Sequence, residues 1–440
     1  MTFFSRSQRT RPREKGQTLL MFVFFMVVLI VFIGLGIDLG FAYITKAELS
    51  KGVDAAALAG MLNFSQGTVT AENIAKDTFA ANYRQSGRDV NAITPSITWS
   101  NDASNGNNFI DVSATTQINT FFIRVMPAIG GADFSKLQVS SSAQATRSRV
   151  DIELVLDRSG SMNPTTGTTQ GGKNLPGAVT QFLSYFSETL DKIGMDSFAS
   201  TVTNDFSIAT PFKTPISTAA SNLIYAGGTF SVGGLTNALV QLNAVAVPAG
   251  QNVIKVAVFF TDGKANMIQQ LLGCGQVLNF GGFDTSRSGA AFYPTNTPVT
   301  ESAQNCYPCS APENGTIGTT GCTGGCGGCD VNSYVSPQTG GAVGFTTDGI
   351  TSDSEFECEQ IANQMRAQGI YVFCAGLNAD PNNPVNFQFL QQVANDPGPP
   401  ANPAFDSNLP VGKALIANDP TQLDAVFKQI AEEILLRLTR

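Results

Sequence analysis

The stretch Asp157-Arg158-Ser159-Gly160-Ser161-Met162 directly follows an apolar run that ends at Leu156. One carboxylate and two hydroxyls stand at alternate positions, where the chain leaves a predicted buried strand. Oxygen ligands of this kind suit a hard divalent cation, Mg²⁺ above all, with coordination places left for water or a visiting group. The same residue types are also common in ordinary turns and helix caps, so a plain turn is the alternative interpretation.

Two later loops give this stretch its context. Gly227-Gly228-Thr229 precedes an amphipathic segment, and the apolar run 256–260 ends in Thr261-Asp262-Gly263. Loops that follow the strands of an open parallel sheet gather at its carboxyl edge, so these side chains are expected to converge on one ion. The predicted ligands are Asp157, Ser159, Ser161, Thr229 and Asp262.

These three pieces, in this order, resemble the von Willebrand factor A domains and their metal-ion-dependent adhesion site. The resemblance covers roughly residues 150–440, apart from one insertion. It implies that Mg²⁺ or Mn²⁺ is coordinated directly or through water by the hydroxyls of Ser159, Ser161 and Thr229. Asp157 and Asp262 would mostly hold waters.

Two alternatives remain open within that set. Thr236 is a rival threonine, but it falls inside a helical pattern, whereas Thr229 has the Gly-Gly-Thr-then-helix order of the family. Asp262 is also explained as an ordinary turn residue after a strand.

The composition narrows the possible functions. The chain has 440 residues, 42% hydrophobic and 14% charged, which is enough for two or three domains with their own cores. A net charge of −8 argues against a nucleic-acid partner. Histidine is absent, which removes the usual general base, the Ser-His and Cys-His pairs and every histidine zinc site. We therefore expect a binding protein and not an enzyme.

The N-terminus predicts a membrane anchor. Basic residues dominate positions 1–15, and the next 22 residues, Gly16–Ile37, carry no charge, which is long enough to cross a bilayer. A signal peptide would be shorter and end in a small-x-small cleavage site, which is missing at 37–40. A buried soluble helix is the other alternative. We expect a cytoplasmic tail over 1–17, a transmembrane helix over 18–37, and everything later outside the cytoplasm.

Residues 38–64 keep helical character. Gly36-Ile37-Asp38 and the alanine-rich segment 54–59 resemble the N-terminal module of TadG-like proteins of Flp (Tad) pilus assembly, over roughly residues 12–64. Lys15-Gly16-Gln17 also resembles a prepilin processing point. Met21 stands where pilins carry glutamate, so we do not expect this chain to be cut and polymerised as a pilin.

Residues 65–149 alternate polar and apolar positions between turn clusters, which predicts a small antiparallel β-rich unit. An apolar cluster at 121–126, which includes Phe121 and Phe122, is interpreted as the core of this unit. No chemistry is evident there.

Residues 150–440 alternate apolar strands with helical stripes, ending in a helix from about Asp419. Strands that are apolar on both faces predict an α/β fold with a doubly wound, mainly parallel sheet covered by helices on both sides.

A segment at 264–353 interrupts this alternation and is predicted to be a cysteine-rich loop insertion. Disulfides are favoured, because this part is expected outside the cytoplasm; a four-cysteine zinc site and a redox dithiol are the alternatives. Because the insertion follows Asp262 at once, we expect it to form a wall of the binding face. The disulfide candidates are Cys274, Cys306, Cys309, Cys322, Cys326, Cys329, Cys358 and Cys374.

The favoured hypothesis is a membrane-anchored binding module whose metal takes up an acidic group of a protein partner. The resemblance implies pilus or envelope components as partners, in pilus assembly, adhesion or envelope organisation. One alternative is a minor pilin-like or scaffold subunit in which the metal is only structural. Another is an enzyme, either a metal-assisted hydrolase or a thiol oxidoreductase using Cys306 and Cys309.

Overall fold

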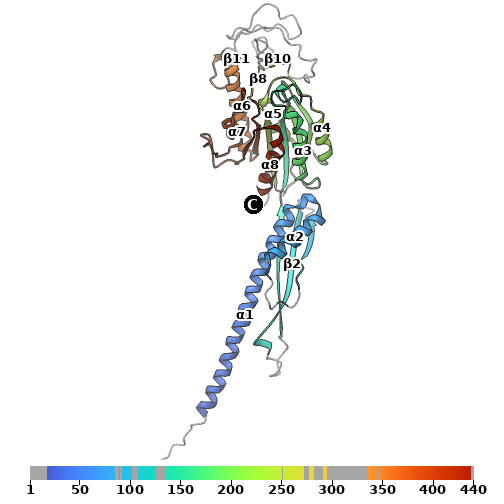
Figure 1. Cartoon of the computed structure of the whole chain (residues 1–440). Helices are drawn as coiled ribbons and strands as arrows, with labels where there is room; N and C mark the ends of the chain where they lie inside the picture. The colour runs from blue at the N-terminus through green and yellow to red at the C-terminus, as the bar shows by residue number, and fades with distance from the viewer. Residues whose placement is uncertain are drawn as a thin grey trace, which may run out of the picture. The chain divides into compact units, whose positions relative to one another are not determined.

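The computed structural model forms two compact units, one built mainly from residues up to and including Ala145 and one mainly from Thr146 onward (Figure 1). It describes residues 17–84, 89, 92–101, 108–124, 135–249, 251–271, 277–281, 291–294, 334–343 and 347–437. Six of the eight cysteines, all but Cys358 and Cys374, lie outside the described residues, and so do the cysteine-rich centre of the predicted insertion and most of the basic tail.

The first unit is organised on one long helix, α1 (Gln17–Leu62). The other elements are η1 (Phe64–Gln66), α2 (Thr68–Asn82) and a three-stranded sheet in the order β1 (Ser96–Asn101), β2 (Asn108–Asn119), β3 (Lys136–Arg147). Small residues of α1 admit the neighbouring elements: a Cβ on Gly52 would lie 3.0 Å from the Phe79 ring of α2, and one on Gly60 would lie 2.5 Å from Ile110 of β2. The alanine-rich part of α1 therefore forms the core of this unit.

Among the described residues, one helix is long and apolar enough to cross a membrane, and it is this one, over Thr18–Leu62. Its N-terminal apolar side chains are exposed, as expected of a segment whose solvent is lipid.

The interpretation of Phe121 and Phe122 as core residues of the β unit is wrong. Both lie just after β2 with their side chains about half exposed, at 53% and 41%. The core is formed instead by α1, α2 and the inward positions of β2, such as Ile110, Val112 and Ile118. An apolar sequence cluster does not by itself distinguish burial in protein from another apolar environment.

The second unit contains a six-stranded sheet in the order β14-β13-β7-β4-β5-β6. Every neighbouring pair is parallel except β5 with the edge strand β6. This confirms the mainly parallel α/β fold. The strands are β4 (Arg149–Asp157), β5 (Lys192–Phe198), β6 (Val202–Ala209), β7 (Val253–Thr261), β13 (Tyr371–Leu377) and β14 (Ala414–Ala417).

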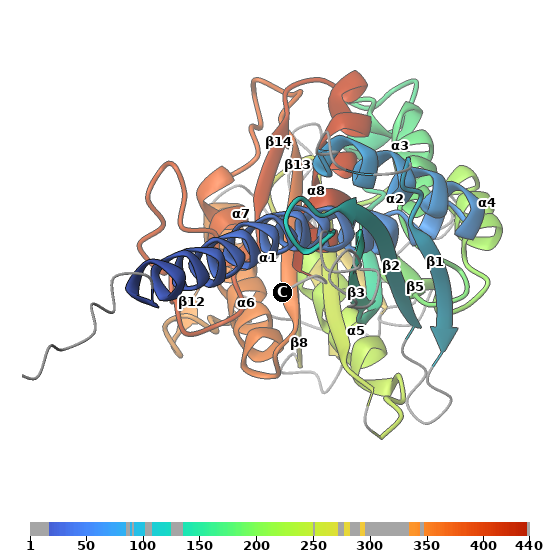
Figure 2. The same ribbon diagram turned by 90° about the horizontal axis from the view of Figure 1, so that it is seen from below.

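Helices cover both faces of this sheet (Figure 2). One core cluster contains α3 (Leu175–Ser184), α4 (Lys213–Ser221) and α8 (Leu423–Arg437). The other contains α5 (Ser231–Ala244), α6 (Thr347–Ala367) and α7 (Phe387–Ala394). Alternate residues of β4 face the two clusters, Leu154 and Leu156 on one side and Val155 on the other. The sheet is therefore buried on both faces, as the continuous apolar strands predict.

Regular structure also extends into both ends of the segment 264–353. β8 (Met267–Leu271), β9 (Val277–Gly281) and β10 (Ala291–Pro294) form a small antiparallel sheet. Later in the chain, β11 (Tyr334–Val335) pairs with β12 (Ala342–Val343). Met267 and Ile268 are buried, so the start of this segment belongs to the packed unit. The remaining short helices are η3 (Gly160–Met162), η4 (Gly171–Lys173) and η5 (Pro420–Gln422).

Candidate metal centre

The candidate site lies where two central strands end. Asp157 is the last residue of β4, and Asp262 directly follows Thr261, the last residue of β7. These strands are parallel neighbours, with Leu156 opposite Phe260. The two carboxylates are therefore brought to the same edge of the sheet by strand register, as the sequence predicts.

Hydroxyls from the loop after β4 contact the second carboxylate. Ser161 Oγ donates to Asp262 Oδ1 at 2.8 Å, and Ser159 Oγ lies 3.5 Å from the same oxygen. The two serine oxygens are 3.0 Å apart. Ser159 and Asp262 are buried, and Ser161 is partly exposed. Three of the five predicted ligands thus form one hydrogen-bonded cluster.

Asp157 lies at the base of this cluster and is fully buried. Its Oδ1 accepts the backbone N–H of Ser159 at 2.7 Å, and its Oδ2 accepts the hydroxyl of Thr261 at 2.6 Å. These bonds connect the end of β4 to the end of β7 and stabilise the turn of the serine loop, the segment after β4 that contains Ser159 and Ser161.

The loop of Thr229 packs beside the serine loop. Gly160 N–H donates to the carbonyl of Gly227 at 3.0 Å, and Thr229 N–H donates to Asn266 Oδ1 at 2.7 Å. Gly227 has φ +92°, a backbone conformation that favours glycine, and a Cβ there would lie 2.6 Å from Ser200 Oγ. Thr236, the rival, is exposed within α5 and lines a different hollow.

Two further hydroxyls belong to the site and were not predicted. Thr169 Oγ1 contacts Asp262 Oδ2 and lies 3.0 Å from the carbonyl of Ser161. Thr261 binds Asp157, as described above. The sequence could have identified Thr261, because this residue stands beside Asp262 at the end of a predicted strand. The sequence gives no indication of a role for Thr169, because its segment, Thr165-Thr166-Gly167-Thr168-Thr169, looks like an ordinary polar loop.

Both carboxylates of the site have raised pKa values. Burial, and then the charge of Asp157, raise the pKa of Asp262 to about 7. Burial also raises the pKa of Asp157. Among the described residues, no ion pair reaches either carboxylate. Arg158 directs its guanidinium to Ser197 and Thr203 instead.

The donor set fits Mg²⁺ or Mn²⁺. It combines two carboxylates with hydroxyl oxygens, which are hard ligands, and it contains no thiolate or imidazole. A serine that gives its proton to Asp262 still has lone pairs for a cation, so the observed bonds are compatible with coordination. Within the described part of the chain, no group of three or more His, Cys, Asp and Glu side chains offers a competing site.

Comparisons with known families agree with this arrangement. Residues 16–66 match the model of the Flp pilus-assembly TadE/G-like family, and residues 151–279 match that of the von Willebrand factor type A domain. The chain joins a TadE/G-like module to a von Willebrand factor A domain. Both resemblances drawn from the sequence are confirmed. With the long apolar helix, the TadE/G-like match indicates a single-pass membrane protein.

Solved structures include distant likenesses. The pilus adhesin SpaC from Lactobacillus rhamnosus GG is 16% identical with a TM-score of 0.41, over 79% of this chain and 34% of SpaC. The vWF domain of the type V pili tip protein Mfa5 from Porphyromonas gingivalis is 14% identical with a TM-score of 0.40, over 67% of this chain and 97% of that domain.

Proximal thread matrix protein 1 from the mussel byssus, with a zinc-occupied MIDAS motif, is 13% identical with a TM-score of 0.35, over 66% of this chain and 46% of that one. The chain thus spans only about a third of SpaC and under half of the byssus protein. At these identities and TM-scores, the likenesses assign no function. No curated protein matches the chain.

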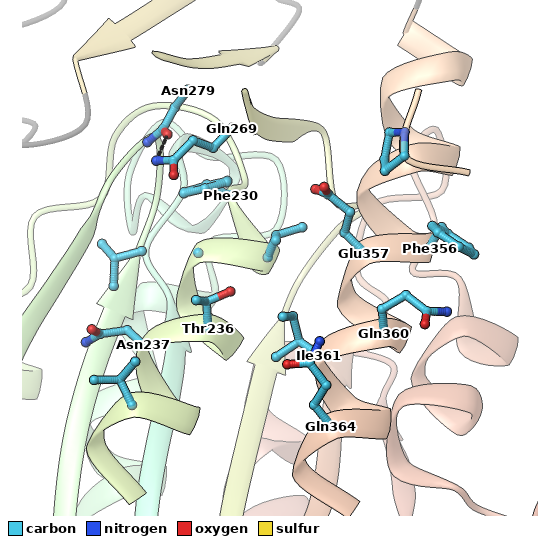
Figure 3. A pocket seen from close by; sticks show the side chains of 15 residues that line it. Phe230, Thr236, Asn237, Gln269, Asn279, Phe356, Glu357, Gln360, Ile361 and Gln364 are labelled. Carbon is cyan, nitrogen blue, oxygen red and sulfur yellow. Dashed lines mark hydrogen bonds between the residues drawn. The ribbon is translucent and has the colours of Figure 1, made fainter. Parts of the chain in front are cut away.

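A groove of about 720 Å³ lies between α5 and α6 of the A domain (Figure 3). Its walls combine apolar side chains such as Phe230 with amides such as Gln269, and Glu357 of α6 reaches into the gap. Burial, and then the charge of Asp353, raise the pKa of Glu357 to about 7. None of the described residues that line the groove is a lysine or arginine. The described lining of this groove therefore offers no positively charged side chain to an acidic group.

Two of the disulfide candidates fall in the described part of the A domain. Cys358 on α6 and Cys374 on β13 are both free thiols in the structure, and both are buried. Burial raises the pKa of each thiol. Buried thiols of this kind are poor nucleophiles, so these two residues offer no catalytic chemistry.

Proposed function

We propose that the A domain binds Mg²⁺ or Mn²⁺ through Asp157, Ser159, Ser161, Thr229 and Asp262, and that an acidic group of a protein partner completes the coordination. The observation that carries the proposal is the cluster of serine hydroxyls on the Asp262 carboxylate, at the edge where β4 and β7 end. Mg²⁺ and Mn²⁺ prefer about six oxygen ligands, which leaves places for water and a partner.

The chemistry of the site explains why a carboxylate would be the ligand. Neutral hydroxyls make up most of the proposed shell, so the ion keeps much of its positive charge. A partner carboxylate would therefore gain a strong electrostatic interaction in a partly desolvated setting.

We place this activity outside the cytoplasm, with residues 1–17 as the cytoplasmic tail and 18–37 as the membrane span. The TadE/G-like match supports a role in Flp-type pilus assembly, adhesion or envelope organisation, with pilus or envelope proteins as partners.

The test is calorimetric titration of Mg²⁺ and Mn²⁺ into the full chain in detergent, with the Ser161→Ala variant titrated in the same way for comparison. Loss of one directly coordinating hydroxyl should weaken binding at least about tenfold, by analogy with the effect of losing supporting ligands. Thr168→Ala is the matched control, because Thr168 is exposed in the same loop region. No metal binding by the parent chain would refute the proposal.

A second candidate function is a scaffold subunit with a purely structural metal. The near-complete burial of Asp157, Ser159 and Asp262 favours it, because a closed shell leaves little room for a partner. Water-proton relaxation of the Mn²⁺-loaded chain separates the two. Exchangeable water on the ion, displaced by added acetate, supports partner binding; a metal with no exchangeable water supports the scaffold.

A further inference from the structure

The loop after β2, residues 120–124, is fastened to α1 through Asp38, the first charged residue after the apolar run. Asp38 is only 1% exposed, and its carboxylate accepts the backbone N–H groups of Phe121, Phe122 and Ile123, each at 2.9 Å. Successive N–H groups of this kind form a concavity that binds an anion. We call residues 120–124 the tip loop.

The tip loop also packs on α1 one turn closer to the N-terminus. A Cβ on Gly34 would lie 2.5 Å from Phe122 Cβ, so only a glycine leaves room for this ring. Gly34 lies inside the uncharged run that ends at Ile37, and it is about 6 Å along the helix from Asp38. The tip loop is thus held at the level of the last turn of the apolar span.

The length of β2 agrees with this position. Its other end contacts α1 at Gly60, through Ile110. The helix rises about 39 Å between Gly34 and Gly60 at 1.5 Å per residue. The strand rises about 30 Å between Ile110 and its last residue, Asn119, at 3.3 Å per residue, and the tip loop continues from there to Phe122. The strand and the tip loop together therefore follow the helix from the packed core to the apolar span (Figure 1).

At this level the tip loop extends an apolar surface already present on the helix. Phe121 and Phe122 are 53% and 41% exposed, and Arg124 beside them is exposed. The neighbouring helix side chains that are also exposed are Ile33, Leu35, Ile37, Leu39 and Phe41.

We propose that Phe121 and Phe122 embed in the interfacial layer of the phospholipid bilayer that α1 crosses, so that the protein contacts the membrane at two places. Aromatic rings favour this layer, and an adjacent arginine can reach lipid phosphates. The three N–H bonds satisfy the Asp38 carboxylate, which allows an acidic group to lie at the membrane boundary. Continuity with the exposed apolar surface of α1 favours lipid over a protein partner.

Tryptophan fluorescence tests this directly, because the chain has a single tryptophan, Trp99. The full chain carrying Trp99→Phe and Phe121→Trp is reconstituted in phosphatidylcholine–phosphatidylglycerol vesicles with brominated acyl chains. Emission from position 121 should be blue-shifted and at least halved by the bromines. The parent chain, whose only tryptophan is Trp99, is the control. Trp99 donates a hydrogen bond to Glu72 of α2, at the end of the β unit opposite to the tip loop. Its emission should therefore not be quenched by the brominated lipid.

Quenching of position 121 by aqueous iodide, without quenching by lipid bromine, would overturn the proposal in favour of a solvent-exposed loop. Insensitivity to both quenchers would overturn it in favour of a protein contact. Asp38→Asn in the same background should reduce the lipid quenching by weakening the loop's attachment, while Asp54→Asn, an exposed carboxylate of the same helix, should leave it unchanged. These measurements need no metal, so they stand or fall independently of the proposed metal site.

Discussion

At the scale of single residues, the proposed metal site depends on side chains that would not themselves touch an ion. Thr169 Oγ1 contacts Asp262 and the carbonyl of Ser161, so it fixes one carboxylate relative to the serine loop. The Thr261 hydroxyl donates to Asp157 Oδ2 and so fixes that carboxylate at the end of β7. Hydrogen bonds that orient metal ligands commonly affect affinity nearly as much as the ligands themselves.

Thr169→Val should therefore weaken Mn²⁺ binding about tenfold while the chain stays folded, since valine keeps the shape and loses only the hydroxyl. Titration followed by the Mn²⁺ spin-resonance signal measures the affinity. Thr168→Val is the matched control and should bind as the parent does. Equal affinities for the two variants would show that Thr169 has no part in positioning Asp262.

Glu153 is a buried carboxyl in the middle of β4, and neither of its oxygens has a hydrogen-bond partner among the described residues. It faces Gly194 of β5, where a Cβ would lie 2.2 Å from Glu153 Oε2. Burial, followed by the charges of Asp196 and Asp205, raises its pKa well above the usual range. The folded chain thus keeps a proton that the unfolded chain releases.

A raised carboxyl pKa makes stability fall as pH rises above the ordinary Glu value toward the folded value. Glu153→Gln removes this loss, so the variant should be more stable than the parent near about pH 8 by about 1 kcal/mol, or roughly 2–4 °C in melting temperature. Near about pH 4 the two should be equal. Thermal unfolding at both pH values checks this, with the exposed Glu432→Gln as control; a variant that is less stable at high pH contradicts it.

At the scale of elements, glycines of α1 leave room for side chains of the elements that pack against it. Gly34 admits Phe122 and Gly52 admits Phe79. These glycines are 18 residues apart, about five helical turns, and so lie on one face. Gly36, two positions from Gly34, has open space around a Cβ.

Gly34→Leu should therefore detach the tip loop, while Gly36→Leu should not. Hydrogen exchange of the amides of Phe121, Phe122 and Ile123 reports this, because Asp38 accepts all three. We expect at least tenfold faster exchange in the first variant only. The same exchange rates in both variants would mean that Gly34 is not needed for the contact.

The sequence predicted the elements that carry strong periodicity and placed four of the five candidate ligands at true strand ends or serine-loop positions. Strand register explains this success: once β4 and β7 are parallel neighbours, Asp157 and Asp262 must meet. Thr169 was missed because its loop has no periodicity. Phe121 and Phe122 were misassigned because an apolar run does not say whether protein or lipid surrounds it.

At the scale of the whole molecule, the chain divides into a first unit that contains the long apolar helix and a second unit that contains the A domain and the proposed metal site. Residues 295–333, between β10 and β11 in the chain, lie outside the described residues, but the residues that follow them are held by hydrogen bonds. Asp353 accepts bonds from the hydroxyls of Tyr334 at 2.6 Å and Ser336 at 2.7 Å. Met267, at the other side, is buried in the core.

Replacing residues 295–333 by a short Gly-Ser linker, together with Cys274→Ser, should leave Mn²⁺ affinity and the melting temperature close to those of the parent. The predicted insertion, which contains this segment, begins directly after Asp262, so we expect the segment to select the partner. Binding to purified Tad pili should therefore be lost. Calorimetry, thermal unfolding and pilus co-sedimentation measure the three quantities. Undiminished co-sedimentation would show that residues 295–333 do not select the partner.

The alignment of β2 with α1 has a mechanical consequence. A lone helix under tension lengthens by breaking its backbone hydrogen bonds turn by turn, since nothing else shares the load. Between Gly34 and Gly60, α1 lies beside β2 and the tip loop, which contact it through Ile110 at one end and Phe122 at the other. Stretching this part of the helix therefore also requires β2 to slide along it and to break its contacts with the helix. The strand thus adds to the resistance of α1 against extension.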